Sequence, residues 1–126
     1  MKLALMIFAG AGVGGLLRWG IGAGVTRLLG SGFPFGTVAV NVVGCALAGY
    51  AHGALHDSAI REEYRTALFV GLLGGFTTFS AFSRDTIMLL EQRQYWLASA
   101  HVIIANILCL GSAFLGMKLA GRSVFA

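Results

Sequence analysis

Residues 71–83 bring glycines, hydroxyl groups and phenyl rings into a stretch that is otherwise apolar enough to lie in a membrane. Gly74 and Gly75 can interrupt a helix, and the carbonyl groups that a break releases are suitable ligands for a hard cation such as Na⁺. Phe79 and Phe82 are three residues apart, so they share a helix face and can turn their electropositive ring edges toward one anion path. Irregular backbone at this depth survives only where protein buries it or where it lines an ion path, so the stretch predicts conduction or transport.

Polar side chains in the two preceding apolar stretches could serve the same path. Arg18 lies past the middle of the first stretch, where it either faces a water-filled cavity and attracts anions or snorkels to the lipid headgroups. Asn41 follows Thr37 by four residues, so both lie on one helix face. Together they either line a polar track or form hydrogen bonds between helices. The residues alone leave both pairs of alternatives open.

The fourth apolar stretch carries weaker signals. His101 and Asn106 are five residues apart, an awkward offset for one helix face. We therefore interpret each as forming hydrogen bonds between helices or with the backbone of its own helix. Cys45 and Cys109 lie inside apolar stretches and have neither the number nor the spacing of a disulfide framework or a zinc site. We interpret both cysteines as small packing residues. Asp85, next to Arg84, is predicted to lie close to an aqueous entrance.

Composition places these residues in a bilayer. The chain has 126 residues, of which 57% are apolar and 11% charged, and its mean hydropathy is +0.82. Since a spanning helix needs about 20 mainly apolar residues, we expect an all-α membrane protein with a single four-helix transmembrane domain over residues 1–126. The predicted helices cover about residues 3–29, 37–55, 66–90 and 96–120, with the break in the third, and an aqueous loop covers His56 to Arg65.

The charge distribution and the glycine spacing indicate which partners to expect: a lipid bilayer and a second copy of the chain. The net charge of +4 comes from scattered basic residues without a cluster, so membrane-flanking charge explains it better than nucleic acid, and no nucleic-acid partner is expected. The bias of basic residues between the two ends of the bundle is small enough to allow insertion in both orientations. A chain this small needs a second copy to enclose a polar track, so we expect at least a homodimer. Glycines four residues apart favour close helix contact at Gly10 and Gly14, Gly20 and Gly24, Gly49 and Gly53, and Gly71 and Gly75.

Three motifs resemble the signatures of the Fluc/CrcB fluoride channels of microbial membranes. They are Gly14-Gly-Leu-Leu-Arg-Trp19, Gly36-Thr-Val-Ala-Val-Asn-Val-Val-Gly44 and Gly71-Leu-Leu-Gly-Gly-Phe-Thr-Thr-Phe-Ser-Ala-Phe-Ser83. The resemblance implies a homodimer of two subunits inserted antiparallel, with two pores that use residues of both. It also implies passive export of cytoplasmic fluoride across the bacterial inner membrane.

The resemblance further implies roles for individual residues. A structural Na⁺ at the dimer centre would bind the backbone carbonyls of Gly74 and Thr77. The pore residues would be Asn41, Phe79, Phe82, Thr37, Ser83 and Arg18. The fourth span departs from the family, because His101, Ala105 and Cys109 stand where a tyrosine and serine hydroxyls are usual; His101, Asn106 and Cys109 are therefore the less certain pore positions.

Two other functions compete with the channel. A small four-helix proton-coupled multidrug exporter would need a carboxylate embedded in the membrane, and the first two spans contain no Asp or Glu. A non-conducting scaffold would leave the polar and aromatic residues of the third span unexplained. An enzyme is not expected, because no nucleophile, base and orienting group can be assembled from these residues.

Overall fold

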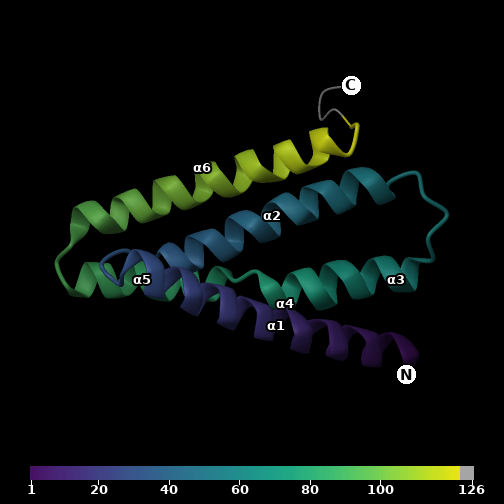
Figure 1. The fold of residues 1–126 in the computed structure, drawn as a ribbon, viewed down its shortest axis with the longest axis horizontal. Coiled ribbons are helices and arrows are strands. Elements are labelled where there is room, and N and C mark those ends of the chain that lie inside the picture. The colour runs from purple at the N-terminus through teal and green to yellow at the C-terminus, as the bar shows by residue number, and fades with distance from the viewer. Residues whose placement is uncertain (123–126) are drawn as a thin grey trace.

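The computed structural model describes residues 1–122, and throughout this range the regular structure is helical, with no strand. Four helical segments are long and apolar enough to cross a membrane, which confirms the predicted four spans. The first, second and fourth are α1 (Lys2–Leu29), α2 (Phe35–Leu55) and α6 (Tyr95–Leu119). The third consists of α3 (Glu62–Thr66), η1 (Ala67–Leu73), α4 (Gly74–Phe76) and α5 (Phe79–Glu91). The N-terminus and the C-terminal end of α6 lie at the same end of the bundle, as an even number of spans requires (Figure 1).

The third span begins earlier than predicted. Glu62 and Glu63 were expected in an aqueous loop, but they occupy the first turn of α3. Carboxylates at this end of a helix are stabilised by the partial positive charge of its free N–H groups. Arg65 Nη2 donates to the Leu55 carbonyl oxygen at 2.6 Å and thereby satisfies the end of α2. The segment that follows, η1, is a π-helix, which is wider than an α-helix. This form is rare in proteins overall, but where it occurs it is often at a functional site.

Glycines let two pairs of helices approach to backbone contact. A Cβ atom at Gly14 of α1 would meet the Leu72 carbonyl oxygen of η1. A Cβ atom at Gly75 of α4 would lie 2.6 Å from the Ala11 carbonyl oxygen of α1. On α2, a Cβ at Gly49 would meet the Ala113 carbonyl oxygen of α6, which runs beside α2 along its length (Figure 1). Three of the predicted glycine pairs therefore pack within the subunit, whereas a Cβ at Gly20 or Gly24 would meet none of the described residues outside its own helix turn within 4 Å.

The bundle has an apolar exterior and a small interior. Val40 and Ala98 are buried, but Phe8 is 79% exposed and Trp19 74% exposed. A soluble domain would bury such side chains, so the exterior is suited to acyl chains or to a second subunit.

Replacement of Gly14 by alanine should destabilise the bundle, because the added methyl group would force α1 away from η1. Overpacking of this kind costs about 1–3 kcal/mol. Gly15→Ala is the matched control, since among residues 1–122 nothing beyond its own turn of α1 lies within 4 Å of its Cβ position. Thermal unfolding of the purified protein in detergent should show a lower midpoint for Gly14→Ala than for Gly15→Ala. Equal midpoints would contradict the packing assigned to Gly14.

Candidate functional site

The third span is broken at Thr77 and Thr78. Both residues have extended backbone, with φ −83° and ψ 158° at Thr77 and φ −153° and ψ 109° at Thr78. The predicted interruption is therefore confirmed, but its predicted position at Gly74 and Gly75 is wrong, because those glycines lie in α4. Gly75 serves the contact with α1 instead. Thr78 begins α5 as a side-chain cap: its Oγ1 accepts from the Ala81 N–H at 3.1 Å.

Asn41 of α2 holds the broken backbone. Its Oδ1 accepts from the Thr78 N–H at 2.7 Å, and its Nδ2 donates to the Thr78 carbonyl oxygen at 3.0 Å. A side-chain amide has two N–H donors, so one remains beyond this pair. Asn41 can therefore form hydrogen bonds between helices and still line a polar track.

The break ends the run of helical hydrogen bonds before Phe79, so the carbonyl groups of residues 74–77 lose their usual helical donors. In an uninterrupted α-helix the N–H groups of Thr78 and Ala81 would donate to the carbonyls of Gly74 and Thr77. They donate instead to the side chains of Asn41 and Thr78. Gly74 and Thr77, whose carbonyls the motif resemblance implies for Na⁺, are two of these four residues. Arg18 Nη1 lies 3.5 Å from the Thr77 carbonyl oxygen, so the guanidinium faces the break.

A cavity of about 230 Å³ lies beside the break. The rings of Phe79 and Phe82 stand at its edge with centroids 5.3 Å apart and planes tilted by 34°. Phe79 is 76% exposed in the single subunit, so its ring is open to whatever covers this face. The full lining is Asn41, Cys45, Thr77, Thr78, Phe79, Phe82, Ala105, Asn106 and Cys109.

His101 lies behind the phenyl rings. It is fully buried, its ring centroid is 4.9 Å from that of Phe82, and Phe33 meets it edge-on. His101 Nδ1 is 3.1 Å from Thr86 Oγ1, while Nε2 has no hydrogen-bond partner among residues 1–122. Unlike Asn106 and Cys109, His101 is not part of the cavity lining and supports the ring of Phe82.

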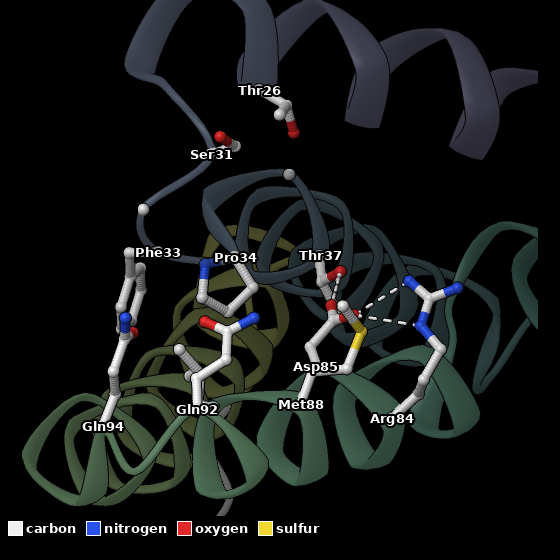
Figure 2. Close-up of a pocket in the computed structure, with 13 residues that line it drawn as sticks. Thr26, Ser31, Phe33, Pro34, Thr37, Arg84, Asp85, Met88, Gln92 and Gln94 are labelled. Carbon is white, nitrogen blue, oxygen red and sulfur yellow. Dashed lines mark hydrogen bonds and ion pairs between the residues drawn. The ribbon is translucent and has the colours of Figure 1, made fainter.

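A second cavity, of about 260 Å³, opens where the loops after α1 and α5 meet. Figure 2 shows Arg84 and Thr37 reaching Asp85 from two sides. Thr37 Oγ1 donates to Asp85 Oδ2 at 2.5 Å, and Arg84 Nη2 donates to Oδ1 at 2.8 Å. The Asp85 side chain is only 12% exposed; the Arg84 guanidinium balances its charge, and the Thr37 hydroxyl adds a hydrogen bond. We call this group of three residues the Asp85 cluster.

Other predicted site residues have local partners. Ser83 Oγ donates to the Phe79 carbonyl oxygen at 3.0 Å, and Asn106 Nδ2 donates to the Val102 carbonyl oxygen at 2.7 Å. Arg18 lines a hollow together with Thr78, Ser80 and Arg84. None of Arg18, Thr37 and Ser83 therefore lines the cavity beside the break, although Arg18 reaches the backbone of Thr77 at its wall.

Sequence reasoning missed the decisive roles of Thr78 and Thr86. In the sequence, Thr78 is only one of several hydroxyl residues between positions 71 and 83, although threonine is a preferred helix cap and its hydroxyl can accept from the N–H three residues later. Thr86, which contacts His101 from α5, carried no usable signal, because the contact depends on how α5 meets α6.

Comparison with known proteins identifies the family. The model of the family described as CrcB-like protein, Camphor Resistance (CrcB), matches residues 5–117. The chain belongs to the CrcB family. A protein of Shewanella amazonensis named "Fluoride-specific ion channel FluC" is 43% identical over 119 residues, 94% of this chain and 96% of its own. Proteins of the same name from Pseudoalteromonas translucida and Caulobacter vibrioides are 42% identical over 115 residues (90% of this chain, 96% of the relative) and 39% identical over 131 residues (100% of both).

The names of these CrcB relatives are consistent with the four apolar helices of the structure, since an ion channel must cross a membrane. The relatives are named as ion channels and not as enzymes, as the absence of a plausible catalytic group suggested. Together with the helices, they make this chain a multi-pass membrane protein.

Replacement of Asn41 by alanine should destabilise the break, because a buried N–H and a carbonyl would lose their partners. Such a loss costs roughly 1–3 kcal/mol for each group left unpaired. Asn106→Ala is the control, since the Val102 carbonyl keeps the helical N–H donor of residue 106. Thermal unfolding should distinguish the two variants, with a shift within about 0.5 kcal/mol for Asn106→Ala. An equally small shift for Asn41→Ala would contradict the role of Asn41.

Proposed function

We propose that this chain forms a fluoride-selective channel that lets cytoplasmic fluoride leave passively across the bacterial inner membrane. The observation that carries the proposal is the break at Thr77 and Thr78, bonded to Asn41 and bordered by the rings of Phe79 and Phe82. Relatives that share about 40% of their residues over nearly the whole chain are named fluoride-specific ion channels.

Fluoride is small and tightly hydrated, so a selective pore must replace its water by other donors without holding it too firmly. The free N–H of Asn41 is one such donor on the cavity wall. The edges of Phe79 and Phe82 carry positive partial charge and supply a weaker attraction. We assign Arg18, Thr37 and Ser83 to the approach to the pore, with the Arg18 guanidinium attracting the anion at an aqueous entrance.

The channel is proposed as a homodimer of antiparallel subunits with two pores. Phe79 and Gly74 are exposed on the single subunit, and only a protein partner would shield the released Gly74 carbonyl from hydrocarbon. In this dimer the Gly74 and Thr77 carbonyls of two subunits would hold one structural Na⁺. Na⁺ takes several oxygen ligands, and one subunit offers too few.

The multidrug exporter is the weaker candidate. Proton exchange requires an embedded carboxylate that is free to change its charge. Asp85, in α5, already accepts from Thr37 and Arg84. The other acidic residues, Asp57, Glu62, Glu63 and Glu91, lie toward the ends of the spans.

Phe79→Ile and Phe82→Ile should each slow fluoride efflux from liposomes by about tenfold or more. Loss of an aromatic edge worth about 1.4 kcal/mol in the barrier corresponds to that factor. Phe8→Ile is the matched control, because Phe8 is an exposed ring on α1 outside both cavities. Size-exclusion chromatography should show that all three variants still assemble as the wild type does. Normal efflux from both pore variants would refute the phenyl role.

Purified protein in liposomes should release fluoride far faster than chloride, measured with ion-selective electrodes. Replacement of all Na⁺ by a large organic cation on both sides should abolish release if Na⁺ holds the break together. Release of fluoride at the same rate without Na⁺ would remove the cation from the proposal but retain the channel. Absence of fluoride release from assembled protein would overturn the channel itself.

A further inference from the structure

Two cysteines face each other across α2 and α6. Ser112 Oγ of α6 donates to the Val42 carbonyl oxygen of α2 at 3.0 Å, which sets the register of this antiparallel pair. Three residues further along α2 and three residues back along α6 are Cys45 and Cys109. Both are free thiols and half-buried, and this register brings them to the same level of the helix pair.

Both thiols are also part of the wall of the cavity beside the break, together with Asn41 and Phe82. A solute in this cavity would therefore meet two sulfur atoms at once. Cysteines closed inside a packed core are inert, but these two have open space in front of them. Their interpretation as packing residues alone does not account for this placement.

We propose that Cys45 and Cys109 form a binding site for one soft divalent metal ion in this cavity. Sulfur ligands select soft cations, and Hg²⁺ accepts two thiolates in linear coordination. Each S–H bond breaks, two Hg–S bonds form, and two protons leave to water without oxidation or reduction. The product is neutral, so no net charge is buried in the apolar surroundings.

A metal ion bound there would lie beside Asn41 and Phe82 and obstruct the anion. This consequence rests on the proposed function, whereas the metal site itself does not. Hg²⁺ should therefore slow fluoride efflux from wild-type liposomes, and a small dithiol should restore it by removing the metal.

The site is tested with the purified full-length chain, loaded with Hg²⁺ and then washed with an excess of a monothiol such as glutathione. The wild type should retain one Hg²⁺ per chain, because the second thiol acts intramolecularly and strengthens binding by roughly 10²-fold or more. Cys45→Ser and Cys109→Ser should each lose the metal in the wash. Metal content and the ultraviolet absorbance of the Hg–thiolate bonds report the result.

A double variant, Cys109→Ser with Ile107→Cys, is the matched control. It keeps two thiols per chain but moves one to a position that is 64% exposed and outside the cavity lining. It should lose the metal as the single variants do. Retention by this control, or loss by the wild type, would overturn the site. A wild type that retains the metal but conducts no fluoride would support the site and overturn the proposed function.

Discussion

A broken helix in hydrocarbon must find hydrogen-bond partners for its backbone inside the protein, and the centre of this structure depends on how that is done. Two side chains supply the partners: the amide of Asn41 bonds both backbone groups of Thr78, and the Thr78 hydroxyl caps α5. Because these side chains take the N–H groups that a helix would have used, the carbonyls of Gly74 and Thr77 lose their helical donors, and the Thr77 carbonyl accepts from Arg18 instead. Bonding of the break and release of these carbonyls from the helix are thus one event.

The surroundings of the break follow from the same requirement. Asn41 can reach Thr78 only if α2 lies close to the third span, and Gly44 permits this, since a Cβ there would meet the Thr77 and Phe76 side chains. Phe79 and Phe82 begin the helix that Thr78 caps, so the cap sets the direction of both rings. His101, Phe33 and Thr86 support Phe82 from behind. The cavity therefore has a wall built from α2, α5 and α6 around one fixed point.

Hydropathy was sufficient to predict the four spans, because the requirement for about 20 apolar residues is local and strong. The existence of the break was also predictable, since glycines and hydroxyl side chains in one span are costly without a purpose. Its position was not: Gly74 and Gly75 looked like the weak point, but their contacts with α1 and η1 keep them helical, and Asn41 instead favours an opening at Thr78. The pairing of Cys45 with Cys109 and the support of His101 by Thr86 depend on helix register, which no single stretch of sequence contains.

The backbone contacts between α2 and α6 have a mechanical consequence. At Gly49 and Gly116 the two helices touch without intervening side chains, so neither can slide or swing without a steric clash. In the proposed channel, the α2–α6 wall beside Asn41 would therefore keep its shape during conduction, and only side-chain rotation would adjust it. On that proposal, these two helices would select ions by size without acting as a moving gate.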